Sequence, residues 1–382
     1  MNTHTIQLEP FATTPFVPQP QQSAARSSEQ YMRWLMIALM CAGIAVIAYV
    51  DWISRALSLG FLYIFPLAFG AIVMRRRTIL LFVPLCVFLV DWLGPYEHAG
   101  WHLLWRNLIS LAGFLAVVLV VSRLVQQRRS LTEAVRQQND EMAKDIALAA
   151  QIQRRMLPQR APTLPGIELA GHMQSAKVVA GDYYDFIEFS DGKLGLVVAD
   201  VAGKGVPAGL LTPTLKAALR FEAAQTRPTQ AVTASLNQLL YDLTDETRYA
   251  TLFYAVLNPV THTLQYTNAG HLPGLWFKAA TREVVWLEEG GLALGLFAGI
   301  NYTSGQSQME RNDILLLYSD GITEAEDAGG HDFTRERLAR LVAEHAVLTA
   351  AALLETIFAE VAEFTQHQTP RDDQTLLILK IK

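Results

Sequence analysis

The chain has little cysteine, little charge and no excess of positive charge. Only two of its 382 residues are cysteines, Cys41 and Cys86, and both fall inside apolar runs, so no disulfide framework is expected. Charged residues make up 18% of the chain and the formal net charge is -5, which together with the lack of a basic patch argues against nucleic-acid binding. The first residues also lack the basic start and small-residue cleavage site of a signal peptide.

What the chain has in surplus is apolar sequence, and it lies near the N-terminus. Residues 1–30 are rich in Pro, Gln, Ser and Thr and are predicted to form a disordered tail. Four apolar runs follow, each close to the roughly 17 to 25 residues that a membrane-spanning helix requires. They predict a four-helix transmembrane sensor region over residues 31–124, with runs at Met32–Val50, Leu57–Met74, Ile79–Leu93 and Leu103–Val121.

The arginines predict the orientation of this region. They gather before the first run, between the second and third, and after the fourth, whereas the other two connections hold few cations. By the positive-inside rule, both termini and the C-terminal domain face the cytoplasm, which implies a multi-pass protein of the inner (cytoplasmic) membrane. The residues concerned are Arg26, Arg33, Arg75, Arg76, Arg77, Arg123, Arg128 and Arg129.

Residues 125–157 form a polar linker with a loose heptad pattern. Apolar residues such as Val135 and Met142 recur along it, interrupted by polar ones such as Arg128 and Gln138. A weak apolar stripe that is interrupted by polar residues favours a parallel two-helix coiled coil, and hence a homodimer. A single solvated spacer helix is the alternative.

Aspartates at strand ends are the candidate chemistry of the rest of the chain. Asp182 and Asp200 flank a predicted hairpin that runs into a glycine turn at Val201–Gly205. Asp320 follows the apolar run Ile314–Tyr318, and Asp372 and Asp373 precede the run Thr375–Ile381. Singly, each Asp is ordinary turn chemistry. Jointly, carboxylates without nearby His or Cys suit hard cations such as Mg²⁺ or Mn²⁺ in a two-metal site.

Hydrophobic periodicity over residues 158–382 predicts a mixed α and β sandwich. Strand patterns occur at Ile167–His172, Leu194–Asp200, Thr251–Leu257, Thr263–Asn268 and Ile314–Tyr318. Amphipathic helix patterns occur at Pro207–Gln225, Gln230–Leu243, Arg335–His345 and Thr349–Thr365.

Five ordered motifs make this part of the chain resemble the metal-dependent protein phosphatase (PPM) family, in particular its bacterial SpoIIE and RsbU branch. They are GDYYD, DVAGKG, NAGHLPG, YSDGITEA and DDQTLLIL, and the resemblance extends from the helix before Leu157 to the end of the chain. It implies an α+β phosphatase domain over residues 158–382, with two antiparallel β-sheets packed as a sandwich and flanked by helices. It also implies hydrolysis of phosphoserine or phosphothreonine on proteins.

Carried over residue by residue, the resemblance implies a site for two divalent cations, Mn²⁺ or Mg²⁺. Asp182 resembles the first metal-binding acid and Asp200 the carboxylate that bridges both metals, with the backbone carbonyl of Val201 as a further ligand. Asp320 and Asp372 would hold the other metal. Two such cations, about 3.5 to 4 Å apart, activate a water for in-line attack, so no protein nucleophile is needed. The absence of cysteine from this domain excludes a cysteine phosphatase.

Other residues in the motifs allow two interpretations each. Lys204 either contacts the phosphate or is solvated surface, and His271 either gives a proton to the leaving hydroxyl or bonds neighbouring backbone in its turn. Asp373 is either an acid behind the ligands or a turn carboxylate. Asp185 and Glu324 lie near ligands in sequence, and surface roles are expected for both.

The sequence therefore predicts a membrane-anchored serine/threonine protein phosphatase under control of its N-terminal sensor. The resemblance implies a small STAS-domain regulator, an anti-anti-sigma factor, as the phosphorylated substrate. The alternative is a catalytically silent membrane scaffold that uses the PPM domain to bind a partner. A transporter-like protein with a regulatory tail is a third interpretation, which the short membrane region disfavours.

Overall fold

A computed structural model describes residues 22–54, 59–93, 101–203, 205–225, 227–244 and 248–382. The chain divides into two compact units, Met1–Asn139 and Asp140–Lys382, and each is described by itself. Residues 1–21, most of the predicted disordered tail, lie outside the described residues. Helix α1 begins at Gln22, so the last part of that predicted tail is helical.

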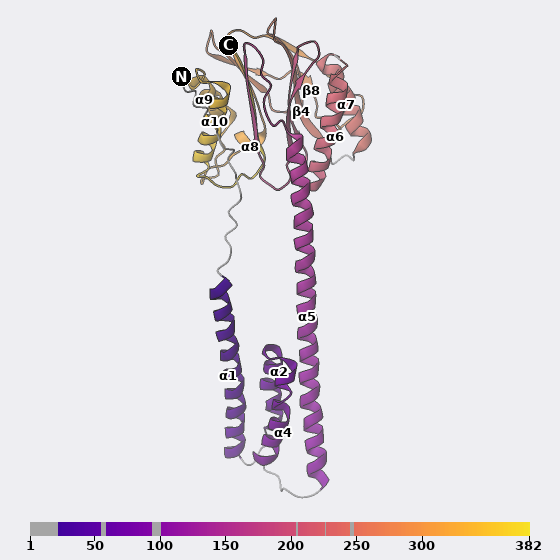
Figure 1. Ribbon diagram of the computed structural model, residues 1–382, viewed down its shortest axis with the longest axis vertical. Coiled ribbons are helices and arrows are strands. Elements are labelled where there is room, and N and C mark those ends of the chain that lie inside the picture. The colour runs from indigo at the N-terminus through magenta and orange to yellow at the C-terminus, as the bar shows by residue number, and fades with distance from the viewer. Residues whose placement is uncertain (1–21, 55–58, 94–100, 204, 226, 245–247) are drawn as a thin grey trace, which may run out of the picture. The chain divides into compact units, whose positions relative to one another are not determined.

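The N-terminal unit is helical, and two of its helices are long and apolar. The first is Tyr31–Ile53 in α1, and the second is Leu104–Met156 in α5. Each contains an 18-residue stretch of high mean hydropathy, 2.1 and 2.5 respectively, so both helices are long and apolar enough to cross a membrane by length and composition. The elements are α1 (Gln22–Ser54), η1 (Gly60–Tyr63), α2 (Ile64–Val73), α3 (Arg76–Ile79), α4 (Phe82–Leu93) and the first part of α5 (Trp101–Met156). Figure 1 labels α1, α2, α4 and α5.

The two middle apolar runs form shorter helices than predicted. Helix α2 has 10 residues and α4 has 12, about 15 and 18 Å of helix against a hydrocarbon core of about 30 Å. Met74 takes an extended conformation that ends α2. Pro84 lacks an N–H and its ring crowds the carbonyl of Leu80, where the helix is broken between α3 and α4. The four-span topology is not confirmed and stays a prediction.

Two antiparallel sheets form the centre of the C-terminal unit. One has the strand order β1-β11-β10-β6-β7, and the other has the order β2-β3-β4-β5-β8, with β9 also paired to β5. Of the strand pairings in the described part of the chain, the two-residue β5–β8 pairing is parallel, as is the isolated bridge between Leu252 and Gly270. The strands are β1 (Ile167–Gln174), β2 (Asp182–Glu188), β3 (Leu194–Val201), β4 (Ala250–Asn258), β5 (Thr263–Ala269), β6 (Gly274–Lys278), β7 (Glu283–Leu287), β8 (Gly290–Gly291), β9 (Gly305–Gln308), β10 (Ile314–Tyr318) and β11 (Gln374–Ile381).

Helices cover the outer faces of both sheets, which confirms the predicted sandwich (Figure 1). One core lies between the sheets and includes Leu196, Phe253 and Leu377. A second core packs α9 and α10 on the β11 sheet, and a third packs α6 and α7 on the β3 sheet. The helices are α6 (Val206–Ala223), α7 (Thr229–Leu243), α8 (Asp320–Thr323), α9 (Arg335–Glu344) and α10 (Ala350–Phe364).

Strand β11 shows why the sheets pack this way. It is a run of apolar residues interrupted near its start and end, and all eight of its residues are buried. A strand buried on both faces must lie inside its sheet with layers above and below it, because its side chains alternate between the two faces. The packing of β11 therefore fixes the position of its first residues, Gln374 and Thr375, at the rim of the sandwich.

Candidate metal centre

Two of the predicted ligands face each other across the β2–β3 hairpin. Asp182 pairs directly with Asp200 in the antiparallel register, so their side chains leave the same face with Cβ atoms about 5 Å apart. A Cβ atom at Gly181 would lie 3.2 Å from Oδ1 of Asp200 and 3.2 Å from the carbonyl oxygen of Val201. These two oxygens therefore lie beside the same point of the backbone, and a side chain at position 181 would crowd both.

The ends of β10 and β11 carry the remaining acids on the other sheet. The Ser319 hydroxyl accepts from the Thr375 amide at 2.9 Å and donates to the Asp373 carbonyl at 3.0 Å. A Cβ atom at Gly321 would lie 2.1 Å from the Asp373 carbonyl oxygen, so the start of α8 approaches this backbone as closely as only glycine allows. Ser319 and Gly321 thus hold Asp320, the first residue of α8, beside the start of β11.

Asp373 joins the two sheets at this rim. Its Oδ2 accepts from the Gly181 amide at 2.7 Å, and its Oδ1 accepts from the Ala176 amide at 2.8 Å. The Thr375 hydroxyl donates to Oδ2 of Asp182. Both oxygens of Asp373 therefore hold the backbone that enters β2, and Asp182 lies against the first residues of β11.

One small hollow collects these groups. Asp200, Asp372 and Asp373 line it, Asp182 is buried next to it with 2% exposure, and Asp320 opens α8 on the same rim. Lys204 lies outside the described residues. The other lining residues are Ala176, Lys177, Val179, Gly181, Gly203, Gly205 and Arg371.

The electrostatics of the hollow favour a cation. Burial raises the pKa of the Asp182 carboxyl well above its ordinary range, and the nearby charges of Asp200 and Asp373 raise it further. The hydrogen bond from the Thr375 hydroxyl lowers it only in part. A buried cluster of carboxylates is stabilised by a bound cation, and an all-oxygen donor set fits Mg²⁺ or Mn²⁺.

Among the described residues, no three His, Cys, Asp or Glu side chains converge tightly enough to enclose one ion. In this arrangement an ion at the rim would take one or two carboxylates and complete its coordination with carbonyl oxygens and waters. Mg²⁺ is commonly held in that way, because it gives up its waters reluctantly. The Val201 carbonyl beside Asp200 is suitably placed as such an additional ligand.

His271 is held by hydrogen bonds at both ring nitrogens. Its Nε2 lies 3.1 Å from the Tyr318 carbonyl, which can only accept, so Nε2 carries the proton and Nδ1 accepts from the Thr251 hydroxyl at 2.8 Å. Burial lowers the pKa of the ring to about 4. The geometry thus favours the backbone-bonding interpretation, because the ring fixes the strand end that precedes Asp320.

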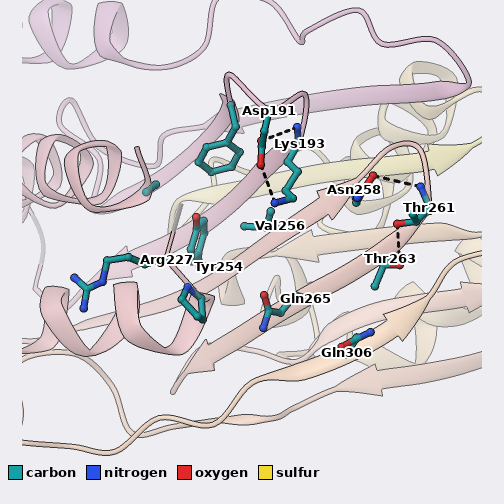
Figure 2. A pocket seen from close by; sticks show the side chains of 13 residues that line it. Asp191, Lys193, Arg227, Tyr254, Val256, Asn258, Thr261, Thr263, Gln265 and Gln306 are labelled. Carbon is teal, nitrogen blue, oxygen red and sulfur yellow. Dashed lines mark hydrogen bonds and ion pairs between the residues drawn. The ribbon is translucent and has the colours of Figure 1, made fainter. Parts of the chain in front are cut away.

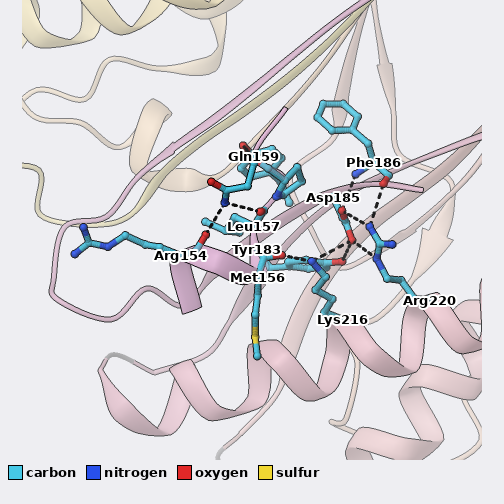
Figure 3. A network of polar contacts seen from close by, with 11 residues as sticks. Arg154, Met156, Leu157, Gln159, Tyr183, Asp185, Phe186, Lys216 and Arg220 are labelled. Carbon is cyan, nitrogen blue, oxygen red and sulfur yellow. Dashed lines mark hydrogen bonds and ion pairs between the residues drawn. The ribbon is translucent and has the colours of Figure 1, made fainter. Parts of the chain in front are cut away.

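Asp185 is not the surface residue that the sequence suggested. It is 1% exposed and bonded bidentately by Arg220, with distances of 2.7 and 2.8 Å. The Tyr183 hydroxyl donates to it at 2.8 Å, and the Lys216 ammonium lies 3.7 Å away (Figure 3). Lys216 and Arg220 stand one helical turn apart on an otherwise apolar stretch of α6, a spacing that could have indicated a buried acid.

The last turn of α5 contacts the backbone that enters the acidic hollow. The Gln153 amide group donates to the Ala180 carbonyl at 2.7 Å and accepts from the Ala180 amide at 2.9 Å. Lys216 also donates to the Met156 carbonyl at the end of the same helix (Figure 3). Gln153 is 6% exposed, so the linker helix is a packed part of the C-terminal unit here.

A larger hollow, of about 390 Å³, lies at the other end of β3 and β4 (Figure 2). Some of its polar groups have local partners: Lys193 pairs with Asp191 at 2.7 Å, and the Asn258 side chain accepts from the Val260 and Thr261 amides. Lys193 precedes the eight-residue strand β3, which places that end of the hollow about 20 Å along the strand from Asp200, and the two hollows share no lining residue. The larger hollow is therefore separate from the acidic rim.

Comparison with known sequences gives relatives over most of the chain. The sequence profile of the family described as stage II sporulation protein E (SpoIIE) matches residues 190–382. Phosphoserine phosphatase RsbU of Bacillus subtilis is 29% identical over 270 residues, which is 70% of this chain and 78% of that protein. Phosphoserine phosphatase RsbP of the same organism is 23% identical over 244 residues, which is 63% of this chain and 58% of that protein.

Solved structures share the fold of the C-terminal unit. The SiaA-PP2C domain of Pseudomonas aeruginosa superposes with a TM-score of 0.57 at 23% identity, covering 64% of this chain and 98% of that domain. The PP2C phosphatase domain of SpoIIE from Bacillus subtilis, with a fragment of its regulatory domain, gives a TM-score of 0.50 at 18% identity. That alignment covers 56% of this chain and 63% of the other. At these identities, the likeness shows the fold alone.

Proposed function

The chain belongs to the SpoIIE family and is a protein serine/threonine phosphatase of the RsbU type, and we propose that it uses two divalent cations at the acidic rim. The reaction would be hydrolysis of phosphoserine or phosphothreonine on a regulatory protein. The observation that carries the proposal is the convergence of Asp182, Asp200, Asp372 and Asp373 at one rim, where burial and mutual repulsion favour a cation.

The chain's own residues would hold and orient the metal centre. The β2–β3 hairpin would contribute three metal ligands, the carboxylates of Asp182 and Asp200 and the Val201 carbonyl. The opposite sheet would contribute the carboxylates of Asp320 and Asp372. Bound Mn²⁺ or Mg²⁺ lowers the pKa of a water and neutralises phosphoryl charge. Thr375 orients Asp182 by a hydrogen bond, and Asp373 keeps the backbone of Gly181 in place. Such outer partners fix the direction of each ligand oxygen.

The substrate we propose is a phosphorylated STAS-domain regulator. Two of the relatives, RsbU and RsbP, are named phosphoserine phosphatases, which supports a phosphoprotein substrate of this kind. Dephosphorylation assays against each phosphorylated STAS protein of the source organism test this. Activity toward none of them would remove the substrate assignment while leaving the phosphatase activity in place.

We also propose that the enzyme is anchored in the inner membrane and controlled through its linker. The two long apolar helices and the arginine distribution support a membrane-embedded N-terminal region with cytoplasmic termini. Apolar side chains along α5 are exposed, including Leu131, Val135 and Met142 at 55 to 67%, which supports a homodimeric coiled coil. Since Gln153 holds Ala180, a shift of the linker would reach the backbone beside Asp182.

The test of the function is phosphate release from a phosphoserine peptide by the full-length chain in mild detergent. We expect turnover with Mn²⁺, none with a chelator, and a loss in Asp320→Asn that exceeds the about 100-fold typical of an outer-shell partner. Asp332→Asn, at an exposed aspartate of the next loop, should keep wild-type turnover. Absence of turnover in the wild-type chain would contradict the proposal and favour the silent scaffold.

A further inference from the structure

Arg371 lies where two hollows meet. It lines the acidic hollow together with Asp200 and Asp372, and it also lines a neighbouring cleft of about 260 Å³. The cleft shares Asp372 with the acidic hollow, so the two form a continuous surface. A phosphoserine placed at the acidic hollow would therefore direct the neighbouring residues of its chain into this cleft.

The guanidinium of Arg371 is held loosely in the described structure. It forms an ion pair with Glu326, yet the Arg371 side chain is 71% exposed and that of Glu326 is 33% exposed. Ion pairs this exposed contribute little and exchange partners readily. The basic residues among those that line the acidic hollow are Lys177 and Arg371, and Arg371 also reaches the cleft.

We propose that Arg371 leaves Glu326 to bind the phosphate of the substrate, and that the cleft receives a basic residue next to the phosphoserine. The inference rests on the proposed phosphatase function of the acidic rim. A planar guanidinium matches two phosphate oxygens at once, which a lysine ammonium cannot do. The exchange frees the Glu326 carboxylate at the moment when a substrate side chain arrives.

The lining of the cleft supports a side chain with an apolar stem and a positive end. Phe358, Val361 and Ala362 of α10 give it an apolar wall, and Glu324 and Glu326 lie at its acidic side. Lysine and arginine bury their methylene groups against such walls while the charged end reaches an acid. The cleft therefore favours phosphoserine peptides with lysine or arginine neighbours over peptides with glutamate neighbours.

The experiment uses the full-length chain with Mn²⁺ and compares Arg371→Gln, Arg371→Lys, Glu326→Gln and the control Arg340→Gln, an exposed arginine of α9. Substrates are p-nitrophenyl phosphate and phosphoserine peptides flanked by lysine or by glutamate. Binding is measured separately, by fluorescence anisotropy with a labelled peptide that carries a non-hydrolysable phosphonate in place of phosphoserine.

We expect Arg371→Gln to raise KM and the phosphonate Kd by about tenfold or more with little change in kcat, as loss of a charge-assisted hydrogen bond does. Arg371→Lys should recover part of that loss. Glu326→Gln should remove the preference for lysine-flanked peptides over glutamate-flanked ones. Arg340→Gln should behave as the wild type.

Unchanged KM and Kd in Arg371→Gln, or an unchanged flank preference in Glu326→Gln, would overturn the inference. A fall in kcat alone would do the same, because it would place the contact of Arg371 in the transition state and not in the binding of the substrate phosphate. Failure of the wild-type chain to hydrolyse p-nitrophenyl phosphate with Mn²⁺ would instead contradict the proposed function, and the inference would fall with it.

Discussion

Asp182 shows how the proposed cation site opposes folding at the level of single residues. The carboxyl is buried beside Asp200 and Asp373, so its charged form is unfavourable until a cation arrives. The strand-end pattern could predict this pair from the sequence, because a hairpin places its two ends opposite one another. It could not predict the burial of Asp185, whose partner Arg220 lies 35 residues further along the chain.

His271 gives a prediction about pH. Its folded-state pKa, about 4, lies below the ordinary value of 6.5, so the folded state binds its proton less tightly than the unfolded state. The stability that this ring contributes is complete above pH 6.5 and is lost as pH falls toward 4, up to about 3 kcal/mol. His271→Gln should therefore show a smaller fall in melting temperature between pH 7 and pH 4.5 than the wild type.

Thermal unfolding of the full-length chain at several pH values checks this. His331→Gln is the matched control, because the His331 side chain is 79% exposed and should leave the wild-type pH dependence nearly intact. If His271→Gln loses as much stability on acidification as the wild type, the buried ring is not the source of the effect.

At the scale of elements, the sequence predicted that the linker is helical but did not predict how far the helix α5 extends. Its polar heptad predicted a linker over residues 125–157, and the structure has one helix from Trp101 to Met156. The packing of Gln153 on Ala180 left no signal in the sequence, since a glutamine in a polar helix is normally solvated. Short strands such as β8 and β9 were also missed, because two to four residues carry no clear periodicity.

Gln153 allows a test of the coupling between the linker and the site. Gln153→Leu leaves the buried amide and carbonyl of Ala180 without their partners, which loosens the backbone beside Gly181 and Asp182. We expect phosphatase activity to fall about 10 to 100-fold and the Mn²⁺ concentration for half-maximal activity to rise. The control is Gln151→Leu, an exposed position of the same helix. Equal Mn²⁺ dependence in both variants would show that the linker contact does not support the site.

At the scale of the whole molecule, the C-terminal unit was the predictable part. Its family was identified from five motifs, and the match over residues 190–382 confirms that resemblance. Motifs of this kind are readable because metal ligands need fixed residue types at strand ends and close backbone approaches need glycine, as at Gly321. The N-terminal unit has no such fixed chemistry. Apolar runs alone could not predict that the two middle ones would form helices of only 10 and 12 residues.

Calorimetric titration of the full-length chain with Mn²⁺ is the most direct test of the proposed two-metal centre. We predict two ions per chain for the wild type, and loss of this binding in Asp200→Asn, whose carboxylate would bridge both ions. Asp191→Asn, at the turn of the same hairpin, should bind as the wild type does. A wild-type chain that takes up no Mn²⁺, or an Asp200→Asn variant that binds two ions with wild-type affinity, would contradict the two-metal centre.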